Sequence, residues 1–427
     1  MTPRTARRTL AAAITTVLAT TALATAPAAT AVPLPGAVPA ASATEDPALT
    51  LVGTSLGPVV NLDSLRGQTE LSWTLSHGNV DATVELTHKG TGWKEVRQFD
   101  DTDSTGSFGF IWHGNLFERS NHPGLPAPNG DYSWKLTAKP HDGTGPELKT
   151  GGDFKVVRSL KIHDFNDNGT PDLFLRDVNG RTMRVDTTYD YARHKVVEAD
   201  ASISVFGEWK SYRQLESVGD VAGTNAPDVI GIDTTGGLWF HAGTGAHEAA
   251  PLVPRVWIGG GWGVYTQLAG GSDLTGDGRA DLVAVDKAGD LWLYKGTGKA
   301  SAPFAPRKKT GFGWGIYNKI TAVGNLAGGP AGDLVARDKN GVLWLYLGKG
   351  DGTFATRSRI GAGWNQYTHI IGIGDATRDG RADLYGIGPS NTVYIHPGSG
   401  HWRVPFTLRQ STDVLANRSY ALTGKVF

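Results

Sequence analysis

Three short acidic loops hold the residues of this chain that are best suited to chemistry. Each has an oxygen-bearing side chain at its first, third, fifth and ninth positions, a glycine at its sixth, and a backbone carbonyl at its seventh. Ca²⁺ takes about six to eight such hard oxygen ligands, and the glycine permits the chain to turn around the ion. The pattern predicts about three Ca²⁺ sites, with the side-chain ligands Asp164, Asn166, Asn168 and Asp172; Asp273, Thr275, Asp277 and Asp281; and Asp375, Thr377, Asp379 and Asp383.

Two further copies of the loop depart from this pattern. The second copy keeps Asp220, Thr224 and Asp228, but it has Ala222 at the third position and Asn225 at the sixth. The fourth copy, which starts at Asn325, retains only Asp333 among the expected carboxylates. No Glu stands at a twelfth position, so the loops are not EF-hands. The alternative interpretation is an Asp/Gly-rich turn whose carboxylates are satisfied by its own backbone amides.

Other catalytic signatures lack the context that their chemistry requires. Gly53–Gly57 satisfies G-x-S-x-G but has no strand–elbow–helix pattern around it, so a turn is expected there. Gly296–Lys299 lacks the spacing of a phosphate loop, and His247-Glu248 is not followed by the second His of a zincin motif. His396 and His401, near Trp402, could line a site but are expected to be unrelated. We predict no catalytic residues.

The acidic loops belong to a repeat of about fifty residues. Four of the loops follow a Trp-x-x-Tyr pair by eleven residues, counted from the Trp: Trp209/Tyr212, Trp262/Tyr265, Trp314/Tyr317 and Trp364/Tyr367. A unit of this period cannot bury its apolar face alone and must stack on its neighbours. Each unit has room for about four strands. We therefore predict an all-β chain with a β-propeller of about five blades at residues 158–427.

The ring of blades must close, because an open end leaves an unpaired strand edge. The first unit, which begins at Asp164, lacks the leading strand, while a tail of residues 404–427 follows the last unit. Asn417–Tyr420 in this tail resembles the start of another unit. We predict that the C-terminus supplies the strand missing from the first blade. Alternatively, residues 50–155 are degenerate blades of a ring of up to seven.

Each unit also carries a hairpin signature, an Asp-x-x-Gly turn between two alternating runs. The turns lie at Asp177–Gly180, Asp233–Gly236, Asp286–Gly289 and Asp338–Gly341. Trp239, Trp292 and Trp344 share one strand position after these turns. We expect them to pack blade against blade; stacking on a carbohydrate is the alternative.

The N-terminal third of the chain does not show the fifty-residue repeat. Arg7 and Arg8, an apolar run and a small-x-small site ending at Ala31 predict a secretory signal peptide over residues 1–31, by the general or the twin-arginine route. Residues 32–49 are an Ala/Pro-rich leader that we expect to be disordered. Residues 50–157 show short alternating runs between turn residues, which predict a separate β-sandwich.

Composition narrows the classes of partner. The chain has no Cys, so an oxidising compartment would add no disulfide. Lys and Arg number 41, as do Asp and Glu, and no basic stripe is interleaved with aromatics. Nucleic acid is therefore not expected as a partner. The apolar run near the N-terminus is too short to span a bilayer. Together with the predicted signal peptide, this favours a secreted, extracellular protein. We expect that protein to be a monomer.

Two family resemblances follow from these motifs. Trp112-His-Gly114 followed by Pro126–Ala138, a P-x-G-x-Y-x-W-x-L-x-A pattern, resembles the immunoglobulin-like domain of flagellar hook-capping proteins, which implies structural support. The acidic loops, followed by runs such as Asp281–Ala284 and Leu291–Tyr294, resemble the FG-GAP/VCBS repeats of exported bacterial proteins and integrin-type propellers. That resemblance covers about residues 158–400 and implies calcium-bearing loops and a role in adhesion, ligand binding or scaffolding. A weaker resemblance, to dispase autolysis-inducing proteins, implies contacts with proteases or transglutaminases.

Two classes of function stay open. The first is a secreted, calcium-stabilised, non-catalytic protein that binds an extracellular polysaccharide or protein. The alternative is a polysaccharide hydrolase or lyase on the same scaffold, or a modulator of extracellular proteases. An enzyme should gather two carboxylates or a His–carboxylate pair in one deep cleft, whereas an open face with exposed apolar rings favours binding.

Overall fold

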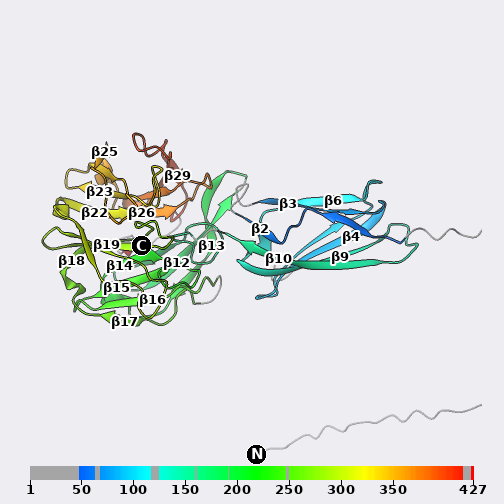
Figure 1. The fold of residues 1–427 in the computed structure, drawn as a ribbon, viewed down its shortest axis with the longest axis horizontal. Coiled ribbons are helices and arrows are strands. Elements are labelled where there is room, and N and C mark those ends of the chain that lie inside the picture. The colour runs from blue at the N-terminus through cyan, green and yellow to red at the C-terminus, as the bar shows by residue number, and fades with distance from the viewer. Residues whose placement is uncertain are drawn as a thin grey trace, which may run out of the picture. The chain divides into compact units, whose positions relative to one another are not determined.

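The structure is a computed structural model, and it describes residues 48–62, 68–116, 125–158, 161–190, 192–246, 250–416 and 425–427 (Figure 1). The predicted signal peptide, most of the leader and Asn417–Tyr420 lie outside these residues. Within the described ranges, regular structure consists of strands and short 3₁₀ turns, so the all-β prediction is confirmed. No helix in these ranges is long and apolar enough to cross a membrane.

Residues 51–157 form two sheets around a shared apolar core. One sheet has the order β1-β3-β6, with β1 (Leu51–Thr54), β3 (Thr69–Leu75) and β6 (Ser107–Trp112). The other has the order β2-β10-β9-β4-β5, with β2 (Val59–Asn61), β10 (Leu148–Val157), β9 (Gly130–Pro140), β4 (Val80–His88) and β5 (Lys94–Phe99). A short ladder joins β7 (Asn115–Leu116) to β8 (Leu125–Pro126). These three- and five-stranded sheets do not have the four-stranded form of the repeat.

Alternation in the sequence explains these strands. Along β4 the residues alternate between buried and half-buried, so Val84 and Leu86 face the core. Trp73 of β3 faces the same core and lies 6.1 Å from the ring of Trp134 in β9. A strand that alternates in this way buries one face and leaves the other wet. The two-layer arrangement agrees with the prediction for this region, while its immunoglobulin-like assignment and the boundary at residue 157 stay predictions.

The repeat region forms five four-stranded antiparallel sheets among the described residues. The first has the order β13-β12-β11-β30, and the other four run in chain order, β14 to β17, β18 to β21, β22 to β25 and β26 to β29. The first sheet comprises β11 (Leu173–Arg176), β12 (Thr182–Asp190), β13 (Lys195–Val205) and β30 (Lys425–Val426). The second comprises β14 (Tyr212–Gly219), β15 (Asp228–Asp233), β16 (Leu238–His241) and β17 (Val256–Gly259).

The remaining sheets keep the same form. The third comprises β18 (Tyr265–Ser272), β19 (Asp281–Asp286), β20 (Leu291–Tyr294) and β21 (Lys308–Gly311). The fourth comprises β22 (Tyr317–Ala322), β23 (Leu334–Asp338), β24 (Leu343–Tyr346) and β25 (Ser358–Gly361). The fifth comprises β26 (His369–Gly374), β27 (Asp383–Ile387), β28 (Val393–His396) and β29 (Gln410–Thr412). Five 3₁₀ turns are η2 (Trp209–Ser211), η3 (Trp262–Val264), η4 (Trp314–Ile316), η5 (Trp364–Gln366) and η6 (Pro389–Asn391).

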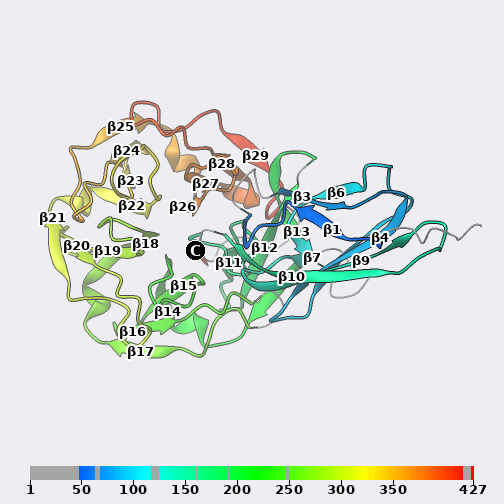
Figure 2. The same cartoon turned by 45° about the vertical axis from the view of Figure 1, so that its right-hand side comes forward.

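These sheets stand around a common centre at which the C-terminus lies, which is the arrangement of a β-propeller (Figure 2). The C-terminal strand completes the first sheet, because β30 pairs antiparallel with β11 and Val426 lies opposite Leu175. Phe174 and Phe427 exchange both backbone hydrogen bonds (2.9 and 3.1 Å), and their rings stack at 5.6 Å. The predicted pairing of the C-terminus with the first unit is confirmed.

The two ends of the sheets carry different connections. In the second to fifth sheets the acidic loop joins the first strand to the second, and the long connection from the third to the fourth strand lies at the same end, called here the loop face. In the first sheet the acidic loop precedes β11, because β30 supplies the first strand. The Asp-x-x-Gly turns and η2 to η5 lie at the opposite end, called here the turn face. Each predicted turn closes as expected, for example with Gly289 N–H donating to Asp286 C=O at 3.0 Å. Trp314 N–H then donates to Gly289 C=O at 2.8 Å, which joins one sheet to the next.

Candidate functional site

The ninth-position Asp of every acidic loop is a structural anchor. Asp172, Asp228, Asp281, Asp333 and Asp383 have no exposed surface. In the third sheet, Asp281 Oδ2 accepts from the N–H of Leu274 (3.0 Å) and Thr275 (2.9 Å). Its Oδ1 accepts from Gly296 N–H at 3.0 Å, across the loop face. This carboxylate therefore fixes both ends of its loop.

The same anchor is present in loops that depart from the calcium pattern. Asp228 accepts from Val221, Ala222 and Gly243 N–H, and Asp333 accepts from Leu326, Ala327 and Gly348 N–H, at 2.8–3.1 Å. The first-position side chain is also satisfied locally. Asp273 accepts from the N–H of Asp277 (3.1 Å) and Gly278 (2.8 Å), and Asn325 accepts from Gly328 and Gly329 N–H. In these respects all the loops match the alternative interpretation, a turn whose acidic side chains accept hydrogen bonds from backbone amides.

The third position separates the two kinds of loop. Polar atoms of Asn166, Thr275 and Thr377 are buried and lack a hydrogen-bond partner. Burial raises the pKa of Asp281 and Asp383, and the nearby hydroxyls of Thr275 and Thr377 oppose that rise. These hydroxyls nevertheless form no hydrogen bond of ordinary geometry. The other two loops have alanine at this position. A buried oxygen without a partner costs stability, and a bound cation would satisfy it.

Burial makes these loops receptive to positive charge. It raises the pKa of Asp281 to about 6 and that of Asp383 to about 7, and it also raises the pKa of Asp375. A divalent cation would favour the ionised forms. The fifth-position carboxylates stand at the surface, where Lys295 Nζ lies 3.2 Å from Asp277 and Arg381 lies 3.5 Å from Asp379.

The loop at Asp164 differs from the other two candidates. Asp164 and Asp172 are its only carboxylates among the four predicted ligands, and Asn166 and Asn168 are buried. Arg158 donates to Asp167 C=O at 2.9 Å, and Lys161 donates to Gly169 C=O at 3.4 Å. The chain thus brings its own cations to this loop.

No group of three or more His, Asp or Glu side chains close enough to hold a metal occurs in the described part of the chain. A Ca²⁺ ion in these loops would therefore need oxygens other than carboxylates. The loops at Asp273 and Asp375 fit this requirement, since each brings a threonine hydroxyl beside a buried carboxylate. The loop at Asp164 fits less well, because it has two carboxylates where each of the other loops has three, and cations already contact its carbonyls.

The repeated aromatic residues form a packing module. Trp262 stacks on Tyr294 at 4.5 Å, and Tyr265 Oη lies 2.6 Å from Tyr294 Oη. Trp292 packs against the core that joins the second and third sheets, and its indole N–H donates to Asp286 at 2.8 Å. The expected packing role of Trp292 is confirmed.

An arginine that the sequence analysis did not single out completes this module. The guanidinium of Arg307 lies 4.1 Å from the ring of Trp292 and donates to Tyr265 Oη. Arg255, Arg357 and Arg409 stand in the same way in other sheets. A signal existed, because Arg255, Arg307 and Arg357 each precede the next Trp of the repeat by seven residues. The guanidinium covers one face of the ring, so that face is not open for stacking on a sugar.

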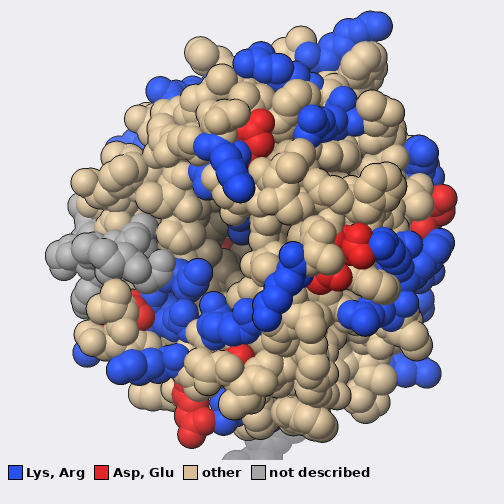
Figure 3. Space-filling model, turned by 90° about the vertical axis from the view of Figure 1, so that its left-hand side faces the viewer, with Lys and Arg blue, Asp and Glu red and all other residues tan. Residues whose placement is uncertain are grey.

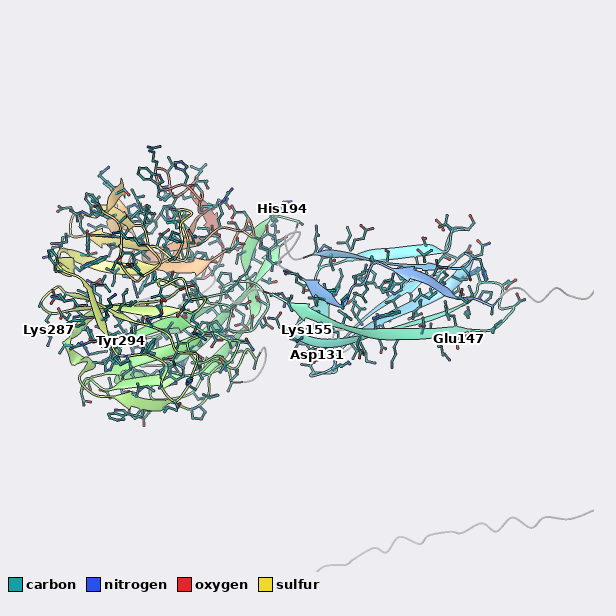
Figure 4. All side chains as sticks on the ribbon, in the orientation of Figure 1. Asp131, Glu147, Lys155, His194, Lys287 and Tyr294 are labelled. Carbon is teal, nitrogen blue, oxygen red and sulfur yellow. The ribbon has the colours of Figure 1, made fainter. Side chains whose placement is uncertain are left out.

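The turn face exposes apolar side chains and has a central hollow (Figure 3). Phe206 and Phe312 are 92% and 84% exposed, and Val178, Val264 and Ile316 are also exposed on this face. Figure 4 labels Lys287, in the β19–β20 turn, at the left edge of the molecule. Figure 3 views that side and shows a central hollow with more Lys and Arg than Asp and Glu around it.

Two cavities test the enzymatic alternative. A cavity of about 20 Å³ between the innermost strands is lined by His163, Glu216, Lys319 and Phe427. This volume suits about one water molecule, not a sugar ring. A wider cavity of about 430 Å³ on the loop face is lined by Asp220, Asp273 and several glycines. The carboxylates of Asp220 and Asp273 already accept backbone hydrogen bonds, as Asp220 does from Gly223, Thr224 and Asn225.

The remaining candidates from the sequence are structural. His396 is buried, its Nε2 lies 2.9 Å from Tyr367 Oη, and its ring lies 4.6 Å from that of Trp364. Burial lowers the pKa of His396 to about 4. His401 is exposed, so the two histidines do not form one site. Ser55 is exposed, and its Oγ accepts from Ser72 N–H at 2.8 Å. The G-x-S-x-G segment is not the expected turn, because Gly53 and Thr54 end strand β1 and Ser55 lies in a bend after it.

Comparisons with known proteins support the repeat. The FG-GAP-like repeat family matches residues 331–386, and no curated protein matches the chain. A lectin from Agrocybe aegerita, solved for its recognition of non-reducing terminal N-acetylglucosamine, shares 15% identity over 83% of this chain and 96% of its own, with a TM-score of 0.34. The BP39L lectin of Burkholderia pseudomallei shares 13% identity over 75% and 95%, with a TM-score of 0.31.

A further solved structure is a Ca²⁺-stabilised adhesin that helps an Antarctic bacterium bind ice. It shares 10% identity over 86% of this chain and 97% of its own, with a TM-score of 0.17. TM-scores this low carry no conclusion about the ligand of this chain. The repeat match spans β23 to β26 and most of β27, so for this segment the resemblance to FG-GAP repeats is confirmed.

Proposed function

We propose that this protein is a secreted β-propeller of five blades, stabilised by calcium, that binds an extracellular polysaccharide or protein without catalysis. The exposed apolar side chains of the turn face carry this proposal. Phe206 and Phe312 each lie within three residues of a buried Trp, on rigid turns between sheets. Leaving such rings in water costs about 25 cal/mol per Å² of apolar surface, and exposed apolar patches on a folded surface typically mark interaction sites.

The region of residues 50–157 would act as a spacer that presents the propeller. Its resemblance to immunoglobulin-like domains of exported proteins supports this role, as does the predicted signal peptide over residues 1–31. We propose a monomer, because the strand edge of the first sheet is covered by β30 of the same chain.

Calcium would stabilise the folded propeller and would not contact the bound ligand. Asp273, Thr275, Asp277 and Asp281 would hold one ion, and Asp375, Thr377, Asp379 and Asp383 another. The buried threonine hydroxyls support this assignment. The loop of Asp164, Asn166, Asn168 and Asp172 would bind Ca²⁺ most weakly, because Arg158 and Lys161 already contact its carbonyls. When bound, the Ca²⁺ ion would offset the negative charge of the neighbouring buried carboxylates in each loop.

The test is a binding panel of glycans and secreted proteins, probed with the mature protein and with Phe206→Ser/Phe312→Ser. We expect the double variant to bind at least about tenfold more weakly, because each ring lost from an interface costs about 1 kcal/mol or more. Leu408→Ser is the matched control, since Leu408 is 86% exposed but lies in the β28–β29 connection at the loop face. If Phe206→Ser/Phe312→Ser bound the ligand as well as Leu408→Ser does, the proposed role of the turn face would be contradicted.

A further inference from the structure

The fourth position of the acidic loops has a left-handed backbone, and the first loop fills this position with an aspartate. Gly223, Gly276 and Gly328 hold the position in the second, third and fourth loops, with φ between +69° and +75°. Asp167 has φ +56° in the first loop, and Arg378 has φ +57° in the fifth. Glycine adopts this conformation without steric cost, whereas a residue with a side chain does not. The first loop therefore carries a costly residue where glycine would fit, and its side chain must offset that cost.

The side chain of Asp167 contacts the two-sheet region, the name used here for residues 51–157. Its carboxylate accepts from the backbone N–H of Asn129 at 2.6 Å and from Asn129 Nδ2 at 3.0 Å. Asn129 lies in the connection between β8 and β9 of the two-sheet region. Its Oδ1 accepts in turn from the backbone N–H of Arg158, at 2.6 Å. One asparagine thus donates twice to the first acidic loop and accepts from the segment that follows β10.

Arg158 makes a second connection between the loop and the two-sheet region. Its Nη1 donates to Ala127 C=O in that region and to Asp167 C=O in the loop, the latter at 2.9 Å. The side chain also passes between two glycines. A Cβ on Gly114 would lie 3.3 Å from Arg158 Nη2, and a Cβ on Gly169 would lie 3.4 Å from its Nε and Cδ. The lack of a side chain at both positions leaves room for the guanidinium.

We infer that Asn129, Arg158 and Asp167, together called the clasp, fix the two-sheet region to the first acidic loop of the propeller. The three residues are half-buried, and the bonds of the Asp167 carboxylate and the Arg158 guanidinium are charge-assisted, which makes them stronger than bonds between neutral groups. Loops with glycine at the fourth position have no side chain there to form such a contact. This inference rests on the proposed role of the region as a spacer and adds that the spacer is rigid.

Trypsin tests the clasp, because it cleaves after Arg158 only in molecules that have released this side chain, so the rate follows the population of the open form. The mature protein is digested in chelator, and the fragments are identified by mass. The key variant is Asp167→Gly, which installs the residue of the second, third and fourth loops. We expect cleavage after Arg158 to become at least about tenfold faster, as the loss of a charge-assisted contact predicts. Arg378→Gly, the same change in the fifth loop, is the matched control and should leave this rate unchanged.

Cleavage after Lys287 is the internal reference, since Lys287 lies in an exposed turn of the third sheet. Its rate should be the same in all variants, which separates release of the clasp from a global loss of stability. Asn129→Ala changes the partner outside the propeller and should also speed cleavage after Arg158. Because both changes break one contact, the double variant should show less than the product of the two single effects.

Two results would overturn the clasp. One is equal cleavage after Arg158 in the wild-type protein, Asp167→Gly and Asn129→Ala. The other is an equal acceleration by Asp167→Gly and Arg378→Gly, which would assign the effect to the loop backbone and not to the contact with Asn129. Either result would leave the proposed binding function intact, because that function is tested by the ligand panel and the variants of the turn face.

Discussion

The loops at Asp273 and Asp375 and those at Asp220 and Asn325 share one scaffold but differ in what they leave unsatisfied. In all four, a buried ninth-position Asp accepts backbone hydrogen bonds from the start of its own loop and from the connection between the third and fourth strands. Only the first pair places a hydroxyl oxygen beside that carboxylate without giving it a partner. The comparison teaches that the ninth-position Asp belongs to the fold, whereas the third position distinguishes a metal loop from a turn.

The largest effect should come from removing the shared anchor. Asp333→Ala would leave the N–H groups of Leu326, Ala327 and Gly348 without an acceptor. Because each unsatisfied buried donor costs about 1–3 kcal/mol, the free energy of unfolding should fall by about 3 kcal/mol or more. Urea denaturation measures this loss, which should be the same with Ca²⁺ and with chelator. A loss seen only in Ca²⁺ would mean that Asp333 is a metal ligand.

A smaller effect should appear as a dependence on pH. Burial raises the pKa of Asp228 to about 7, above its value in the unfolded chain. The folded state therefore binds the proton more tightly, and this contribution to stability is full below about pH 4 and is lost as the pH rises through about 7. In chelator, the free energy of unfolding should fall by about 1–3 kcal/mol between pH 5 and pH 8. Asp228→Asn should make this slope shallower without abolishing it, because burial also raises the pKa of Asp281 and Asp383. An unchanged slope would assign the whole pH dependence to other groups.

The smallest effect should come from converting one kind of loop into the other. Asn325→Asp, Ala327→Thr and Gly329→Asp would give the fourth loop the side chains of the third. Pro330→Gly is also needed, because the sixth-position Gly278 has φ +83° and proline is held near −65°. The fourfold variant should gain about 1–2 kcal/mol of Ca²⁺-dependent stability, measured by thermal melting. The triple variant that keeps Pro330 is its control and should gain none.

Much of the repeat region could be predicted because its signals are local and recur. The Asp-x-x-Gly turns and the strands beside them follow from the fifty-residue repeat. The closing role of the C-terminus follows from the leading strand that the first unit lacks. Two features required the structure. The bonds from Asp281 to Gly296 N–H and from Arg307 to Tyr265 join residues 15 and 42 positions apart, which local spacing cannot pair.

The region of residues 51–157 shows the same limit more strongly. Alternation located strands such as β4 and β9, but it could not order them. The parallel pairing of β2 with β10 joins residues almost one hundred positions apart. Long-range pairing depends on the packing of whole sheets, so the sequence of a single strand does not specify its partner.

Thermal melting of the mature protein in millimolar Ca²⁺ and in chelator tests the central claim most directly. The variants are Asp277→Ala/Asp379→Ala and, as matched control, Thr224→Ala/Gly329→Ala in the loops that lack the pattern. At a hundred times the dissociation constant each site should add about 2.7 kcal/mol, so the wild-type midpoint should rise clearly in Ca²⁺. The account predicts that this rise is largely lost in the aspartate variant and kept in the control. Equal midpoints of the wild-type protein with Ca²⁺ and with chelator would contradict it and leave all five loops as turns.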